Sequence, residues 1–228
     1  MKAKILDSRD VLNPHTIEAD SKRIKIVALG DSLTAGLQTQ FDVQDPQMWN
    51  PYSRDLEVMT RRYLKTHKSD VDVQVINSGV CGDRTIDMLS RFNRDVVGQH
   101  PDYVIIWGGT NDIGWNLEST EILRNLREMY DIAESHKIGC VACTVPSILG
   151  FDDLIPPRLL LNELIRAEAE ERSLPLIDLF AATTDPQTNR LLEEYSGDGL
   201  HLNVEGYTKS GQTVFNEWLK RLLDELLQ

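Results

Sequence analysis

The sequence predicts an α/β protein, a three-layer α/β/α sandwich built on a five-stranded parallel sheet. Short apolar runs alternate with longer amphipathic segments, a pattern typical of a parallel sheet covered by helices on both faces. The chain has 228 residues, of which 41% are hydrophobic, enough for one large domain with a buried core. It contains no repeat or linker. We therefore expect an N-terminal arm over residues 1–22 and a single domain over residues 23–228.

Five short apolar runs are expected to form the strands. The first run, IKIVAL, ends at a glycine, and the third, YVIIW, is apolar throughout, as in strands buried on both faces. In chain order, the predicted strands are 24–29, 71–76, 103–107, 139–145 and 174–179.

The segments between and after the strands carry apolar residues at helical spacing. Ser119 or Thr120 suits the N-cap of the third helix, and Pro157 suits the first turn of the fourth. Strict alternation of strands and helices predicts right-handed crossovers, with ligands bound at the carboxyl ends of the strands. The predicted helices are 51–67, 84–97, 119–137, 157–172 and 204–227.

Charge and cysteine content exclude several classes of protein. The 24 basic and 36 acidic residues give a net charge of −12, which argues against a nucleic-acid partner. The first residues contain no apolar signal region, and no later stretch approaches the length of a membrane span, so we expect a cytoplasmic protein without permanent membrane association. Three cysteines cannot form a fully paired disulfide framework, and Cys140 and Cys143 are interpreted as buried thiols of a strand.

Four polar, glycine-rich turns follow the predicted strands. Because the strands are parallel, their carboxyl ends meet at one edge of the sheet, and the turns should converge there. Each turn alone is weak evidence, since Gly82 also suits a plain turn and Asn111 a local hydrogen bond at a strand end. The turns are GDSLTAG at 30–36, NSGVCGD at 77–83, GGTND at 108–112 and DGLH at 198–201.

Ser32 in the first of these turns is either a helix cap or a nucleophile. A serine nucleophile needs a base within hydrogen-bond reach and a third group that orients the base. His201 falls in such a turn, and Asp198 lies three residues before it, on the same side of one helical turn. The other histidines lie in the N-terminal arm, at helix ends or in a surface turn: His15, His67, His100 and His136.

Other carboxylates compete with Asp198 for the role of partner to His201. Asp31 is expected to brace its own turn, and Asp112 to bond backbone groups nearby. Asp178, at the end of the fifth predicted strand, is a candidate to buttress the loop that carries His201. Spacing favours Asp198.

These motifs resemble those of the SGNH (GDSL-type) hydrolase family. Gly30-Asp31-Ser32-Leu33 matches its signature, Gly82 its second glycine, Gly109-Thr110-Asn111-Asp112 its G-x-N-D motif, and Asp198 with His201 its D-x-x-H motif. The resemblance implies a flavodoxin-like SGNH hydrolase fold and an esterase or lipase-like enzyme that cleaves carboxylic esters or thioesters through an acyl-enzyme.

The same resemblance implies roles for individual residues. Ser32 is the implied nucleophile, and the backbone N–H groups of Ser32 and Gly82 with the side-chain amide of Asn111 form the implied oxyanion hole. Glycine suits position 82 because a backbone must approach the reacting oxygen without a Cβ atom in the way. We expect neither a metal ion nor another cofactor, because no residues outside the triad show zinc-type spacing.

The substrate is expected to be a small-molecule ester. Trp49, Trp115 and Phe151 lie in or beside the loops that follow the predicted strands and are candidates to line the substrate site. These residues do not distinguish a carboxylester, a thioester, a lysophospholipid and an acetylated sugar.

Two alternative functions do not involve catalysis. Glycine-rich turns at strand ends also hold phosphate groups, so the chain could be a non-catalytic module that binds phosphate or a nucleotide on a flavodoxin-like sheet. It could also be a catalytically silent scaffold. The sequence lacks the G-x-x-x-x-G-K-[ST] and G-x-G-x-x-G motifs, and neither alternative gives Asp198 and His201 a purpose.

Overall fold

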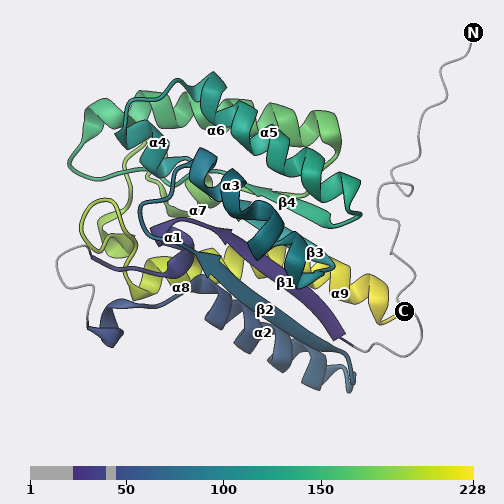
Figure 1. Cartoon of the computed structure of the whole chain (residues 1–228). Coiled ribbons are helices and arrows are strands. Elements are labelled where there is room, and N and C mark those ends of the chain that lie inside the picture. The colour runs from purple at the N-terminus through teal and green to yellow at the C-terminus, as the bar shows by residue number, and fades with distance from the viewer. Residues whose placement is uncertain (1–22, 40–44) are drawn as a thin grey trace, which may run out of the picture.

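The computed structural model describes residues 23–39 and 45–228, so the predicted N-terminal arm lies outside the described residues. Five parallel strands of the described residues form one sheet in the order β2-β1-β3-β4-β5, with β1 inside the sheet (Figure 1). This order reverses beside β1, as the doubly wound topology requires. The strands are β1 (Arg23–Gly30), β2 (Asp72–Gly79), β3 (Tyr103–Trp107), β4 (Gly139–Cys143) and β5 (Leu176–Ile177).

Helices cover both faces of the sheet, which confirms the predicted three-layer sandwich (Figure 1). Alternate residues of β1 point to opposite faces. Ile26 belongs to the core beneath α2, α8 and α9, whereas Val27 belongs to the core beneath α3, α5 and α6. The long helices are α2 (Tyr52–Thr66), α3 (Thr85–Asp95), α5 (Ser119–Ser135), α6 (Ile155–Arg172) and α8 (Val204–Val214), with α9 (Lys220–Leu226) after a π-helical segment, Phe215–Leu219.

Short helices follow the strands at the carboxyl edge of the sheet. β1 leads into α1 (Ser32–Ala35), β3 into α4 (Thr110–Gly114) and β5 into α7 (Leu179–Thr183). A Cβ atom at Gly79 would lie 2.2 Å from the backbone nitrogen of Ala35, so glycine lets the end of β2 pass against α1. The 3-10 segments are Pro46–Met48, Val97–Gln99, Asp152–Leu154 and Glu193–Tyr195.

The predicted strand boundaries differ from the observed ones at two edges of the sheet. β2 continues to Gly79, because it pairs with β1 along the whole length of that strand. β5 has only two residues, since it pairs with Ala142 and Cys143 alone and its continuation is taken into α7.

The predicted N-cap of α5 is wrong. Glu118 occupies that position without a side-chain cap bond, and Ser119 is the first residue inside the helix. The hydroxyl of Ser119 is buried and donates to the carbonyl oxygen of Pro157, at 3.4 Å, which ties α5 to α6. Tertiary contact therefore replaces local capping at this helix.

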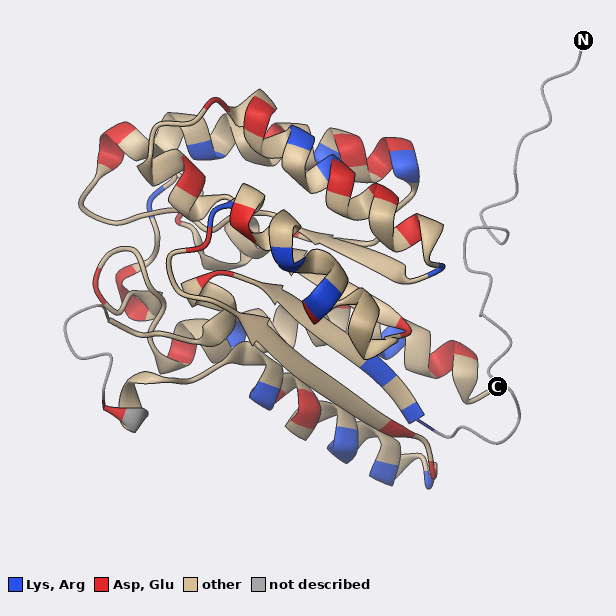
Figure 2. Ribbon diagram, viewed as in Figure 1, with Lys and Arg blue, Asp and Glu red and all other residues tan. Residues whose placement is uncertain are grey.

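The interior of the sheet carries no charge. Figure 2 shows acidic and basic residues along the outer helices and at the beginnings of β1 and β2, while β3 and β4 have neither. Cys140 and Cys143 are free, buried thiols of β4, as predicted, and burial raises the pKa of both. Within residues 23–39 and 45–228, no helix is both long and apolar enough to span a bilayer.

Candidate active site

The turn after β1 places Ser32 at the carboxyl edge of the sheet. Ser32 is the first residue of α1, and its side chain is buried apart from a 7% exposed fraction. Asp31 caps the helix by accepting a hydrogen bond from the backbone N–H of Leu33, at 2.9 Å. This confirms the expectation that Asp31 braces its own turn. The backbone N–H of Ser32 has no partner within the helix, because it lies in the first turn.

The structure brings Ser32 and His201 together although 169 residues separate them. The Ser32 hydroxyl lies 3.0 Å from Nε2 of His201, and Nδ1 of His201 lies 2.9 Å from a carboxylate oxygen of Asp198. His201 is 4% exposed. When Nδ1 donates to Asp198, Nε2 presents its lone pair to the hydroxyl, the tautomer that a general base needs. The predicted juxtaposition of these three side chains is confirmed.

Asp198 also shapes the loop that carries the histidine. One of its oxygens accepts backbone hydrogen bonds from Leu200, at 3.1 Å, and from His201, at 2.8 Å, while the other faces the imidazole. The loop closes on itself through a bond from the N–H of Gly197 to the carbonyl oxygen of His201, at 2.7 Å. The carboxylate therefore sets both the backbone turn and the orientation of the ring.

Gly82 and Asn111 come from the turn after β2 and from α4. Gly82 has a φ of +83°, and a Cβ atom there would meet nothing within 4 Å. The left-handed backbone of this turn favours glycine, a second reason for glycine at this position beside the expected approach of the reacting oxygen. The side-chain amide of Asn111 donates to the carbonyl oxygen of Asp83 at 2.9 Å. An amide nitrogen carries two hydrogens, so this bond uses only one of its donors.

Asp31 is buried with one carboxylate oxygen that has no hydrogen-bond partner. Burial, reinforced by the nearby charges of Asp112 and Asp83, raises its pKa from 3.8 to about 7, against the opposing hydrogen bond from Leu33. Arg158 is buried in the same region, and burial lowers the pKa of its guanidinium to about 10, opposed by the charge of Asp31.

The other two carboxylates bond partners that lie far from them in the sequence. Asp112 accepts hydrogen bonds from the backbone N–H and the hydroxyl of Thr85, so it bonds backbone as expected, at the start of α3. Asp178 caps α7, accepts from Thr144 and pairs with Arg166. These contacts lie away from the loop of His201, so the expectation that Asp178 buttresses that loop is wrong.

The three candidate substrate-binding residues lie in different surroundings. Trp49 forms an antiparallel bridge with Leu37, just after α1. Trp115 follows α4 and is 71% exposed, with the guanidinium of Arg84 5.7 Å from its ring centroid. Phe151 is 58% exposed, directly before a 3-10 turn. Residues 40–44, which precede Trp49 in the chain, lie outside the described residues.

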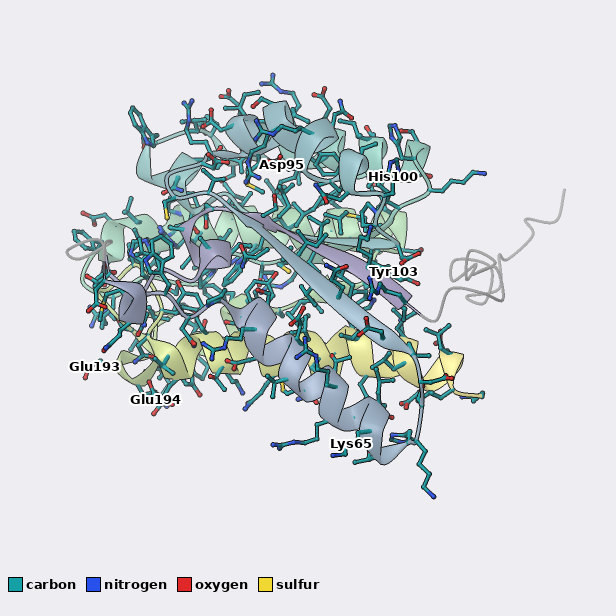
Figure 3. All side chains as sticks on the ribbon, turned by 60° about the horizontal axis from the view of Figure 1, so that its bottom comes forward. Lys65, Asp95, His100, Tyr103, Glu193 and Glu194 are labelled. Carbon is teal, nitrogen blue, oxygen red and sulfur yellow. The ribbon has the colours of Figure 1, made fainter. Side chains whose placement is uncertain are left out.

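Of the other histidines, His15 lies outside the described residues, and His67 and His136 follow the ends of α2 and α5. Figure 3 shows His100 and Tyr103 toward one end of the molecule and Glu193 and Glu194 at the opposite end. His100 follows a 3-10 turn that leads into the beginning of β3, whereas the site gathers where the strands end. In the part of the chain that the structure describes, no group of three or more His, Cys, Asp or Glu residues is arranged to hold a metal ion.

The sequence did not predict a role for Asp83 and Arg91. Arg91 bonds the carbonyl oxygen of Gly30, and Asp83 accepts from the side chain of Asn111. The missed signal is the position of Arg91 beside Phe92 on the stripe of buried residues along α3. An arginine on the buried stripe of an amphipathic helix needs polar partners in the interior, and such partners lie near the site.

A doubly wound sheet with a Ser–His–Asp chain at its carboxyl edge defines a hydrolase of the SGNH type. A family model for the GDSL-like lipase/acylhydrolase family matches residues 28–209, most of the chain, and the chain belongs to this family. The protein is therefore a hydrolase of the esterase and lipase-like class, as the sequence predicted.

The chain is also similar to several individual proteins. The crystal structure of a lipase/acylhydrolase from Enterococcus faecalis is 30% identical with a TM-score of 0.68, over 87% of this chain and 96% of that one. An acetylxylan esterase from Geobacillus stearothermophilus is 24% identical over 151 residues, 60% of this chain and 68% of that protein. The lipoprotein YqeF of Bacillus subtilis (strain 168) is 33% identical over 119 residues, which span half of this chain but only 44% of that protein. The predicted cytoplasmic location stays a prediction.

Proposed function

We propose that the protein hydrolyses carboxylic esters through an acyl-enzyme on Ser32. The observation that carries this proposal is the continuous hydrogen-bond chain from Ser32 through His201 to Asp198, with distances of 3.0 and 2.9 Å. His201 removes the proton of Ser32 as its oxygen attacks the ester carbonyl carbon, then gives that proton to the departing alcohol. A water molecule, deprotonated by the same imidazole, releases the acid.

The tetrahedral intermediate needs donors aimed at its oxyanion. The backbone N–H groups of Ser32 and Gly82 and the remaining N–H of the Asn111 amide are the proposed donors. Each pre-aimed donor of this kind contributes roughly 3–4 kcal/mol to transition-state stabilisation. None of the three carries a net charge, so the site stabilises the charge that develops in the reaction without binding an anion strongly beforehand.

For the substrate, we propose an ester with a short acyl group. The relative named as an acetylxylan esterase supports an acetyl ester. The exposed rings of Trp115 and Phe151 are proposed as apolar walls for the substrate. Trp49, which bridges Leu37 beside the nucleophile turn, is proposed as a third wall.

The proposal is tested by treatment with a fluorophosphonate, followed by mass-spectrometric mapping of the modified residue. We expect modification of Ser32 in the wild-type protein and none in Ser32→Ala. A wild-type protein that stays unmodified would contradict the nucleophile, and binding of inorganic phosphate or a nucleotide would then support a non-catalytic module.

A panel of p-nitrophenyl esters and matched thioesters defines the substrate. We expect kcat/KM to be highest for the acetyl ester and to fall through butyryl to octanoyl esters. A maximum for octanoyl, or for a thioester, would leave the mechanism in place and reject the short-acyl carboxylic ester.

A further inference from the structure

Arg91 contacts three separate segments at the carboxyl edge of the sheet. It lies on α3, and its side chain is 8% exposed. Its guanidinium donates to the carbonyl oxygen of Gly30 at 2.8 Å, to a carboxylate oxygen of Asp83 at 2.6 Å, to the hydroxyl of Ser78 at 3.2 Å and to a carboxylate oxygen of Asp95 at 3.0 Å. One buried side chain thus joins the ends of β1 and β2 to the turn after β2.

The bond to Gly30 reaches the nucleophile turn directly. Gly30 is the last residue of β1, two positions before Ser32, and its carbonyl oxygen also accepts from the N–H of Val80 at 3.0 Å. Val80 begins the turn that contains Gly82. The same oxygen is therefore shared by Arg91 and by the turn that presents the Gly82 N–H.

The bond to Asp83 reaches the other two proposed oxyanion donors. Asp83 follows Gly82 directly, so holding its carboxylate restrains the peptide of the preceding glycine. The carbonyl oxygen of Asp83 accepts from the side-chain amide of Asn111, at 2.9 Å. Arg91 therefore bonds the Ser32 turn directly, through Gly30. Through Asp83 it reaches Gly82, the preceding residue, and Asn111, which bonds the carbonyl oxygen of Asp83.

We propose that Arg91 is a positioning residue for the reaction, because its guanidinium fixes the separation between the nucleophile turn and the Gly82–Asn111 side of the site. This inference rests on the proposed function. Arginine suits the task because its planar fork directs several N–H donors along fixed lines, whereas a lysine ammonium is a compact charge that cannot reach all of these acceptors at once. Arg91 touches no reacting atom in this scheme.

The chain offers a matched control on the same helix. Arg94 also bonds Asp95, at 2.6 Å, but it is 75% exposed and has no bond to either turn among those the structure describes. Replacing Arg94 removes a helix ion pair of the kind that contributes little to stability at an exposed position. Differences between Arg91 and Arg94 variants therefore isolate the contacts with the site.

The experiment measures kcat and KM for p-nitrophenyl acetate in Arg91→Met, Arg91→Lys and Arg94→Ala. Misplacement of donors by about 1 Å reduces a rate by roughly 10²-fold, so we expect kcat of Arg91→Met to fall about ten- to a hundredfold with little change in KM. Arg91→Lys should fall between wild type and Arg91→Met, and Arg94→Ala should match wild type. A folded Arg91→Met with wild-type kcat, or with a change in KM alone, would overturn the inference.

Rescue by a guanidinium compound separates positioning from general support of the fold. In Arg91→Ala, millimolar methylguanidinium should raise kcat several-fold, with no effect on wild type or Arg94→Ala. A loss of kcat that methylguanidinium leaves unchanged would assign Arg91 a packing role and reject positioning. If the Arg91 variants do not fold, Asp83→Ala, which removes the carboxylate that accepts from Arg91, replaces them: reduced kcat with unchanged KM supports the inference, and wild-type kcat rejects it.

Fluorophosphonate labelling of wild type distinguishes a failure of the proposed function from a failure of the role proposed for Arg91. An unlabelled Ser32 rejects the proposed function itself. A labelled Ser32 together with wild-type kcat in Arg91→Met rejects only the role of Arg91.

Discussion

The turn that carries Ser32 and the loop that carries His201 meet at one point of the sheet edge, but different interactions hold them. The Ser32 turn follows an eight-residue strand that is paired on both sides, with Gly30 opposite Gly79 on β2 and Trp107 on β3. Backbone hydrogen bonds between β1 and its two neighbouring strands therefore fix the position of this turn. A shift of this turn would break the centre of the sheet.

The His201 loop follows the two-residue β5 only after α7 and a segment of turns that ends in the 3-10 helix Glu193–Tyr195. Local bonds hold it: Asp198 with the backbone of His201, and the hydroxyl of Ser196 with the N–H of Gly199 at 2.9 Å. One contact from outside comes from the N–H of Leu149, which donates to the carbonyl oxygen of Gly199 at 2.8 Å. The comparison teaches that backbone pairing within the sheet fixes Ser32, the proposed nucleophile, whereas a few polar contacts in a loop fix His201, the proposed base.

The largest effect is expected from removing Ser32 or His201, the two side chains through which the two regions meet. Ser32→Ala and His201→Ala should each lower kcat/KM by at least about 10⁴-fold, and the double variant should be no worse than either single one, because the two side chains act as a unit. Hydrolysis of p-nitrophenyl acetate measures the rates, and thermal unfolding checks that each variant folds. Losses that add in the double variant would show that the two regions act independently.

Asp198→Asn should cost less, by one to two orders of magnitude, than loss of Ser32, since orientation contributes less than the nucleophile itself. The asparagine oxygen keeps the backbone bonds from Leu200 and His201, but the amide nitrogen cannot accept from Nδ1 of the ring. Asp198→Ala removes both functions and should be less active than Asp198→Asn under the same assay. Equal rates for the two variants would show that the backbone bonds do not matter for positioning His201.

In the nucleophile turn, Asp31→Asn should act mainly on stability and should do so in a pH-dependent way. The pKa of Asp31 is raised from 3.8 to about 7, chiefly by burial, so the folded protein keeps a proton that the unfolded chain has lost. The stabilising contribution is complete below the unfolded pKa and is lost as the pH rises through the folded one. The asparagine variant has no such loss.

Chemical denaturation at pH 5 and pH 8 tests this expectation. The free energy of unfolding of wild type should fall relative to that of Asp31→Asn by about 2 kcal/mol between these pH values. A difference between the two proteins that is the same at both pH values would place the ionisation of Asp31 outside this range.

The parts of the site that follow from strand geometry could be predicted from the sequence. IKIVAL and YVIIW are strands because they are uninterrupted apolar runs, and parallel pairing then brings Ser32 and Asn111 to one edge. The i, i+3 spacing was sufficient to join Asp198 to His201. The length of β5 was not predictable, because an edge strand ends where its neighbour stops pairing rather than where its own apolar run stops.

Side-chain bonds between distant segments left no local trace in the sequence. Nothing near Asp112 indicates that it holds Thr85, and nothing near Asp178 indicates that it pairs with Arg166. These partners come from the packing of α3 and α6 on the sheet. Gly82 shows the same limit. The sequence predicted a role for this glycine in the site, but it did not predict the positive φ that favours glycine there.

The smallest expected effect tests the loop itself. Ser196→Ala removes the hydroxyl that accepts from the N–H of Gly199, between Asp198 and His201. Because Ser196 is only partly buried, water can replace this bond, and stability should change by less than about 1 kcal/mol. The geometry of the loop should nevertheless loosen, so kcat for p-nitrophenyl acetate should fall a few-fold. Ser90→Ala, which removes a similar hydroxyl on the exposed side of α3, is the matched control and should leave kcat unchanged. A lower free energy of unfolding in Ser196→Ala without any change in kcat would contradict this expectation. The loop would then support the stability of the fold rather than the position of His201.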